Sequence, residues 1–460
     1  MRLLLPIVCL LLLAPAAHAQ ERVVTDLQLL DPVLRQLRPA SLYLVDGRIE
    51  AIGAPDGSEF DASIVRWSAD GRFATPGFLD VSVFARTMVS PGHRDRLQDD
   101  HARMLFLAAG VHEVIDLAVS ADSTFAHRGA PVLVAPDGAG AEIPGATAVD
   151  NVQDARALVA TLLAHPRAPD RLSVILDRGR SRRSLTAATL TAILDTAGDT
   201  PVAVYVGTWR DAMDALEAGA RWLVQIPPGP VPAPVLERVQ ELRPLWTPAV
   251  AVGMDFMALM KEQELRESAA FLRALPPQMR ADYGEVRVLQ SRLSEARLQN
   301  EDRLTALRDL HDAGAQFVAG SQSGGLGTAH GWSFLRELQW WAQAGIDGWS
   351  ILAAATWSPD LSGPAGFTAG MVADFNLYAA SPVDDAGQYG SLELVFAGGE
   401  VLDPEALAGR VSHSLTEDIP DNPLPGDNQW SLLIIAVTGF AVLLFLRRLV
   451  KRAAANAVDS

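Results

Sequence analysis

Cysteine and lysine are almost absent from this chain of 460 residues. The one cysteine is Cys9, close to the amino terminus, and the two lysines are Lys261 and Lys451. Without further cysteines the body of the chain forms no disulfide and offers no thiolate to a substrate or a metal. Disulfide-stabilised folds, thiol nucleophiles and thiolate metal sites are therefore excluded together.

Positive charge is also in deficit. The chain has 38 basic residues, 36 of them arginine, against 55 acidic ones, and its net charge is −17. Nucleic-acid surfaces need a basic stripe, so no nucleic-acid partner is expected. A hydrophobic content of 49% with 20% charged residues excludes a disordered chain, and the length suits one large barrel with an accessory domain.

The amino-terminal segment has the pattern of an export signal. In residues 1–19 one arginine precedes an apolar run, and Ala17-His18-Ala19 fits a small-x-small cleavage site. This pattern predicts a secretory signal peptide and a body outside the cytoplasm.

The carboxyl-terminal segment has the pattern of a membrane anchor. Residues 430–446 form an uncharged apolar run that starts at Trp430, and the basic residues Arg447, Arg448, Lys451 and Arg452 follow it. This pattern predicts a transmembrane helix at 430–450 with residues 451–460 as a cytoplasmic tail. Residues 413–429 are acidic and proline-rich and are expected to be a linker. Together the two ends predict a single-pass inner-membrane protein with a periplasmic body.

Strands and helices alternate through the body. Eight strand–helix repeats between residues 77 and 368 predict a TIM-type (β/α)8 barrel, with a helical insertion at 255–313. The predicted strands are 77–83, 111–116, 131–135, 172–177, 202–206, 222–226, 247–252 and 316–320, and the clearest helices are 96–109, 152–164, 185–197, 209–218 and 334–344. Segments 20–76 and 369–412 are β-rich, with a hairpin signal at Asp46-Gly47, and are expected to form one composite β-sandwich.

Several short motifs follow one another in a familiar order. They are Val45-Asp46-Gly47-Arg48-Ile49, Asp70-Gly71-Arg72, Thr75-Pro76-Gly77-Phe78-Leu79-Asp80, Ala109-Gly110-Val111, Leu310-His311-Asp312-Ala313-Gly314 and Ala369-Gly370-Met371-Val372-Ala373-Asp374. In this order and spacing, over residues 22–405, the chain resembles the amidohydrolase superfamily, and within it the imidazolonepropionase- and prolidase-like subgroup. The resemblance implies a hydrolase fold that uses one or two divalent metals to activate water.

The residues that the resemblance assigns to the metal are replaced. It implies a His-x-His pair on strand 1, a carboxylated lysine on strand 4, histidines on strands 5 and 6, and an aspartate on strand 8. The corresponding positions hold Ser82, Phe84, Val174 (beside Ser173), Tyr205, Gln225 and Gln322. No histidine occurs between residues 19 and 92 or between 166 and 310, so a shift in register does not restore the set. No zinc or other cofactor is therefore expected to bind.

Four other side chains are candidates for acid–base chemistry. Asp80 follows the strand-1 motif, His112 and Asp116 are four apart on strand 2, and Asp177 ends strand 4. If these groups converged at the strand ends they would suit metal-free catalysis. The alternative for each is a hydrogen-bonded structural residue, and the sequence favours that alternative.

A glycine- and serine-rich loop follows strand 8. Ser321, Gln322 and Ser323 are candidate ligand-binding residues there, together with Tyr205 and Gln225. Backbone N–H groups of such a loop suit a phosphate or carboxylate, and the alternative is a loop retained from the family fold.

Three functions follow from these observations. The first is a membrane-anchored, catalytically degenerate domain that binds a small molecule or a protein partner. The second is a carbon–nitrogen hydrolase with metal-independent chemistry, and the third is a hydrolase with relocated metal ligands. The first explains the loss of all metal donors beside a retained scaffold, but the sequence alone leaves open whether the chain is an enzyme.

Overall fold

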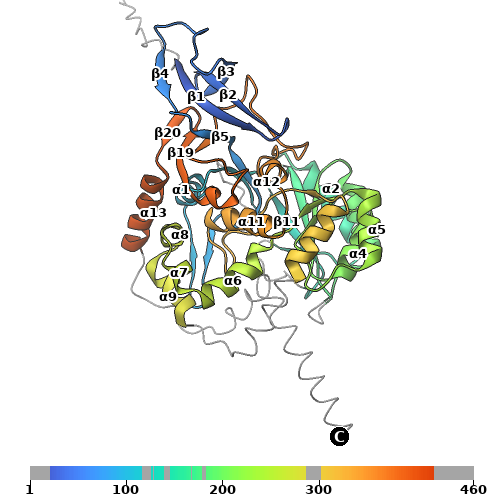
Figure 1. Cartoon of the computed structure of the whole chain (residues 1–460). Coiled ribbons are helices and arrows are strands. Elements are labelled where there is room, and N and C mark those ends of the chain that lie inside the picture. Colours follow the sequence, from blue (N-terminus) through green and yellow to red (C-terminus); the bar gives the residue numbers. More distant parts are fainter. Residues whose placement is uncertain are drawn as a thin grey trace, which may run out of the picture.

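Two parallel sheets covered by helices, and a further sheet at one end, make up the computed structural model (Figure 1). The structure describes residues 21–116, 126–127, 129–138, 146–166, 168–178, 183–285 and 302–418.

Strands from both ends of the described chain form one eight-stranded sheet. Its strands are β1 (Glu21–Asp31), β2 (Gln36–Val45), β3 (Arg48–Gly53), β4 (Val65–Ser68), β5 (Phe73–Pro76), β18 (Phe375–Tyr378), β19 (Leu392–Ala397) and β20 (Glu400–Leu402). β18 lies antiparallel to β5, which joins the two terminal segments. Asp46 and Gly47 take positive φ angles of 48° and 76° in the β2–β3 hairpin, as their turn signal predicts.

The central strands are parallel and fall into two sheets. The first contains β6 (Phe78–Val83), β9 (Val111–Asp116) and β10 (Ala126–His127). The second contains β11 (Gly129–Val134), β12 (Thr147–Ala148), β13 (Arg171–Leu176), β14 (Val202–Val206), β15 (Trp222–Val224), β16 (Leu245–Thr247) and β17 (Gln316–Phe317). β7 (Thr87–Val89) and β8 (Arg94–Arg96) form a separate antiparallel pair.

The two parallel sheets are bonded to each other beyond β17. The N–H of Val81 donates to the carbonyl of Ala319 (3.1 Å), and the N–H of Phe84 donates to the carbonyl of Ser323 (2.7 Å). β6 therefore runs beside residues 319–323, although β17 itself ends at Phe317. The carboxyl ends of these strands lie together at one edge.

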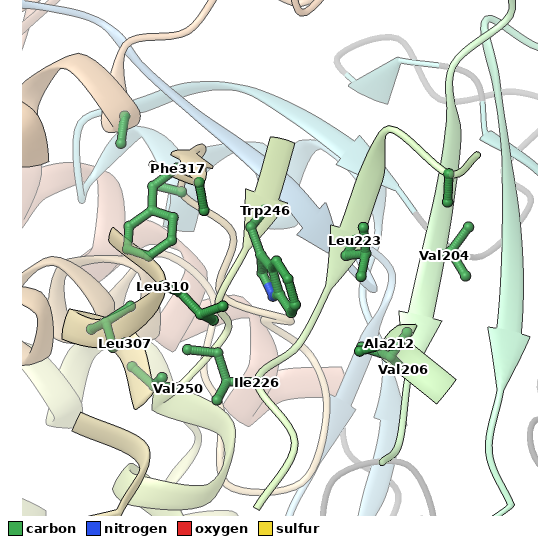
Figure 2. Packing of buried hydrophobic residues seen from close by; sticks show 14 of the residues in the cluster. Val204, Val206, Ala212, Leu223, Ile226, Trp246, Val250, Leu307, Leu310 and Phe317 are labelled. Carbon is green, nitrogen blue, oxygen red and sulfur yellow. The ribbon is translucent and has the colours of Figure 1, made fainter. Parts of the chain in front are cut away.

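Helices cover the parallel sheets, as Figure 1 shows for α2, α4 and α5. The helices are α1 (Asp99–Leu107), α2 (Val152–Ala164), α3 (Ala187–Ala197), α4 (Trp209–Glu217), α5 (Ala233–Leu242), α6 (Ala251–Lys261), α7 (Gln263–Arg266), α8 (Ala269–Ala274), α9 (Pro277–Glu285), residues 302–312, α11 (Trp332–Gln343), α12 (Gly348–Ala355) and α13 (Pro404–Asp418), with a 3-10 turn η1 (Ala386–Gly390). Figure 2 shows the packing between strands and helices, where Trp246 lies among Leu223, Ile226 and Leu310. Trp246 is fully buried in this core.

The described parallel strands follow the order expected of the barrel. β6 pairs with β9, β9 pairs with β10, and β11, the next described strand along the chain, begins the series that runs through β13 to β17. Beyond β17 the chain returns to β6, where Val83 and Ser323 form a parallel bridge. The terminal segments, expected as a composite sandwich, pair in one eight-stranded sheet in which β18 lies antiparallel to β5.

The expected membrane anchor needs correction. Among the residues that the structure describes, no helix is long and apolar enough to cross a bilayer. The structure therefore does not support the transmembrane helix, the attachment to a membrane through it or the inner-membrane location. Residues 1–19 and 430–460 lie outside the described residues, and the expected linker at 413–429 begins within α13, which extends to Asp418.

A buried carboxylate fixes the start of α6. Glu337, on α11, accepts the backbone N–H groups of Val250 (3.0 Å) and Ala251 (2.6 Å) and the indole N–H of Trp341 (2.8 Å). These backbone groups open the helix and have no partner within it. Burial raises the pKa of Glu337 to about 8. The segment 247–252, expected as a strand, accordingly ends as β16 at Thr247 and becomes helical at Ala251.

We expect Glu337→Leu to destabilise the fold by about 3–5 kcal/mol, because it leaves three buried donors without an acceptor. Glu217→Leu on the exposed side of α4 is the matched control and is expected to change stability by less than about 0.5 kcal/mol. Urea unfolding followed by tryptophan fluorescence measures both. Equal effects of the two substitutions would contradict the assigned role.

Candidate functional site

A buried aspartate joins the first parallel strand to the loop after the last one. Asp80, on β6, is fully buried. Its Oδ1 accepts the backbone N–H groups of Ser321 (3.0 Å) and Ser82 (3.2 Å), and its Oδ2 accepts the hydroxyl of Ser321. Burial raises the pKa of Asp80 to about 7, although the three hydrogen bonds oppose that shift. Both carboxyl oxygens are therefore engaged by the protein itself.

The serines of the loop are bonded to one another and to the loop backbone. The hydroxyls of Ser321 and Ser323 are 2.5 Å apart, and the hydroxyl of Ser323 donates to the carbonyl of Ala329 (3.1 Å). Thr328 Oγ1 donates to the carbonyl of Gln322 (2.8 Å). Ser321 and Ser323 thus hold the loop together. Their hydroxyl groups have hydrogen-bond partners within the protein and need no ligand to satisfy them.

Two hydroxyls meet between strands β6 and β14. Ser82 Oγ lies 3.1 Å from the hydroxyl of Tyr205, and both side chains are buried. Burial raises the pKa of Tyr205, and the nearby Asp80 and Asp116 add to the effect. Gly320 leaves space for this pair, because a Cβ at residue 320 would come within 2.9 Å of Ser82 Cβ. Two positions that the family resemblance assigns to metal ligands are thus satisfied by a neutral hydroxyl pair.

The side-chain amide of Gln322, in the loop after β17, lacks hydrogen-bond partners among the described residues. Its backbone N–H donates to the carbonyl of Ser82 (2.6 Å), and its side chain is only 1% exposed. Neither the amide oxygen nor the amide nitrogen of that side chain has a hydrogen-bond partner among the described residues. A buried amide that lacks both partners is costly and uncommon in folded proteins.

The backbone turns left-handed after three neighbouring strands. Gln225 follows β15 with φ 76°, Ala249 follows β16 with φ 48°, and Gln322 has φ 51°. These conformations are unfavourable for residues with a Cβ and are concentrated at functional sites. The N–H of Gln225 donates to the carbonyl of Thr247 (2.7 Å), which ties two of these strand ends together.

Asp177 and Asp116 also lie at strand ends and are buried. Asp177 follows β13 and leans over β14, since a Cβ on Gly207 would come within 2.6 Å of its Oδ1. Asp116 Oδ1 accepts the backbone N–H of Ala85 at 3.4 Å.

His112 lies at the opposite end of its strand. Its Nε2 is 3.1 Å from Oδ1 of Asn376, and its Nδ1 is 3.7 Å from Oδ1 of Asp374. His112 therefore contacts the turn before β18 and β18 itself, and the structure does not bring it together with Asp80, Asp116 or Asp177.

Two of the replaced metal positions are apolar. Val174 is fully buried in the core between strands and helices, and Phe84 packs against the cluster of Leu79, Val81 and Val224. His330, which follows the Gly/Ser loop, has its Nε2 2.9 Å from the carbonyl of Ala85, and burial lowers its pKa to about 4.

The side chains at the strand ends do not fit a divalent metal centre. Zinc sites need several imidazole, thiolate or carboxylate donors around one point. Here the assigned positions present two hydroxyls, two amides, a valine and a phenylalanine, and within the described ranges no three His, Cys, Asp or Glu side chains gather in this way. The strand ends instead carry neutral hydroxyl and amide groups, and the one nearby carboxyl group of this set, Asp80, is fully buried.

Ser82, as the partner of Tyr205, and Thr328 were not predicted as interacting residues. The sequence marked Ser82, because it stands where the family resemblance implies a histidine. It did not reveal the partner of Ser82, because Tyr205 is 123 residues away in the chain. Thr328 follows the Gly/Ser loop, and no sequence pattern marks it.

We expect the free energy of unfolding to fall by about 2–4 kcal/mol between pH 4 and 7 because of Asp80 alone. The pKa of Asp80 is about 7 in the fold, against an ordinary value of 3.8, so the unfolded chain loses its proton first as the pH rises. Asp80→Asn keeps an acceptor for both N–H groups and should flatten this part of the profile. Asp195→Asn, an exposed position on α3, is the control. Parallel profiles for the wild type and Asp80→Asn in urea unfolding would refute the assignment.

Several solved structures with similar folds are named as peptidases or related enzymes. They include a Xaa-Pro dipeptidase with methionine bound in its active site (15% identity, 83% of this chain and 100% of that chain, TM-score 0.63) and a putative prolidase from Bifidobacterium longum (17%, 85% and 99%, TM-score 0.61). A. niger ochratoxinase is a third (17%, 84% and 96%, TM-score 0.59). No family model and no curated protein matches the sequence. The chain therefore has the fold of the amidohydrolase superfamily, as the order of its sequence motifs indicates.

Proposed function

We propose that this chain is a catalytically degenerate domain of amidohydrolase fold that binds a small, uncharged polar molecule at the carboxyl ends of its parallel strands. The observation that carries the proposal is the buried amide of Gln322, which has no partner for either polar atom among the described residues. An amide offers one acceptor and two donors, which match an amide or a carboxamide of a ligand.

The surrounding groups support a neutral ligand. The buried hydroxyls of Tyr205 and Ser82 bond to each other, and the half-buried Gln225 adds a second amide after the neighbouring strand β15. Oxygen and nitrogen donors of this kind bind amides and alcohols by hydrogen bonds, but they do not lower the pKa of a water molecule as a metal centre does. The proposal therefore includes no divalent metal, no cofactor and no nucleic-acid partner.

A metal-independent hydrolase is the second candidate. It is favoured by the names of the similar structures and by the pKa of Asp80, which lies near the range that suits a general acid or base. Asp80 is less suited to that role in its position, because it is fully buried and both of its oxygens already accept hydrogen bonds. We therefore rank binding above hydrolysis.

We expect the full chain, loaded with zinc and then dialysed, to retain far less than one equivalent of metal by elemental analysis. Hydrolysis of X-Pro dipeptides and N-acyl amino acids should stay at the background rate. One tightly held equivalent of zinc, or metal-free turnover that Asp80→Asn abolishes, would contradict the proposal and support the hydrolase.

We expect Gln322→Leu to raise the melting temperature of the unliganded protein, because it removes a buried amide that costs about 1–3 kcal/mol. The same substitution should abolish the thermal shift that the best ligand of a panel of primary amides and N-acyl amino acid amides gives with the wild type. Gln240→Leu, at an exposed position on α5, is the control and should leave the ligand shift unchanged. A ligand shift that survives Gln322→Leu, or a fall in melting temperature, would refute the role of Gln322.

A further inference from the structure

We propose a second binding site, for a small organic dianion such as a phosphate monoester, at the amino-terminal ends of strands β15 to β17. An open hollow of about 550 Å³ lies there, between the ends of α4 and α5 and the segment 357–362. The volume falls in the usual range of small-molecule sites. The hollow is at the opposite ends of the strands from Gln322 and does not depend on the proposed function.

The charge of this hollow is opposite to that of the chain. Its charged lining residues are Arg221, Arg238, Arg243 and Glu241. With three guanidinium groups and one carboxylate, the lining has a net charge of +2, whereas the whole protein has a net charge of −17. Like charges brought together on one surface repel, and a dianion between them removes that cost.

The arginines keep free donors. Arg221 and Arg243 make no side-chain hydrogen bond or ion pair with another described residue. Arg238 is already paired, since its Nη1 donates to Oε2 of Glu241 (2.5 Å), so Arg221 and Arg243 are the donors for a ligand. Guanidinium groups with free N–H pairs bind phosphate oxygens in a bidentate manner.

The backbone directs two of these side chains toward one place. Arg243 ends α5 in the left-handed conformation (φ 45°), and its Nε lies 3.7 Å from where a Cβ on Gly314 would be. Arg221 stands just before β15, and its carbonyl accepts the N–H of Leu245 (2.8 Å), which places it beside the chain that follows Arg243. A positive φ at an arginine is unfavourable, so the fold maintains this geometry against a local cost.

One side of the hollow is apolar. Trp357 and Leu361 line it and also pack against the interior cluster between the parallel strands, and Leu242 is 41% exposed at its edge. An indole face beside free guanidinium groups suits a ligand with a flat apolar part and an anionic end. This combination distinguishes an organic phosphate from free inorganic phosphate.

The test uses phenyl phosphate as the probe, with the full chain and isothermal titration calorimetry. We expect phenyl phosphate to bind at least about tenfold more tightly than inorganic phosphate, and phenol to give no binding. The double variant Arg221→Gln/Arg243→Gln should weaken phenyl phosphate binding by about tenfold or more, since each charge-assisted hydrogen bond carries that order of affinity. Affinity should also fall with added salt.

Two control variants distinguish binding in this hollow from non-specific attraction to surface arginines and from binding at Gln322. Arg156→Gln, at an exposed position on α2, should leave binding unchanged, and so should Gln322→Leu at the other ends of the strands. Absence of phenyl phosphate binding, equal binding of inorganic phosphate, or equal loss in Arg156→Gln and the double variant would overturn the proposal. Because all these substitutions except Gln322→Leu are at the surface, unchanged urea unfolding confirms that each variant is folded.

Discussion

The bonding of one buried carboxyl group holds the two parallel sheets in register. Asp80 on β6 accepts hydrogen bonds from Ser321, which follows the last strand, and from Ser82 on its own strand. Around this contact the backbone groups of residues 81–84 and 319–323 bond across the gap between the sheets. Three donors offset part of the cost of burying Asp80, so the group favours one precise relation between strand and loop. The positions of Tyr205 and Gln322 depend on that relation, because both are fixed against Ser82.

Local patterns predicted those elements whose ends are fixed by nearby residues. The predicted helix 152–164 and the strand 202–206 coincide with α2 and β14, and Asn151 caps α2 through the N–H groups of Gln153 and Asp154. The prediction of a strand over 247–252 was wrong, because the apolar run of this segment fits a strand or a helix equally well. The acceptor that selects the helix, Glu337, lies 87 residues away from Val250 and leaves no mark on the local sequence.

The candidate site was predictable as a set of positions but not as a set of bonds. The motif order pointed to Asp80, Tyr205 and Gln322, and the structure brings them close to Ser82. The pairing of Asp80 with Ser321 spans 241 residues, so spacing cannot reveal it. Spacing also suggested a dyad of His112 and Asp116, yet residues four apart on a strand lie at different ends of it, and His112 bonds instead to Asn376 from the terminal sheet.

The neutral hydroxyl pair of Ser82 and Tyr205 also bears on how such a chain evolves. The metal centre that the family resemblance implies would require, among its ligands, histidines on β6 and β14 and a carboxylate at residue 322, all in buried positions. Each intermediate with only part of the set would bury a charge or an imidazole beside partners that do not satisfy it. Tyr205 and Ser82 would lose their mutual hydrogen bond at the first step. A stability barrier thus lies between these neutral side chains and a metal centre, even though the fold itself would not have to change.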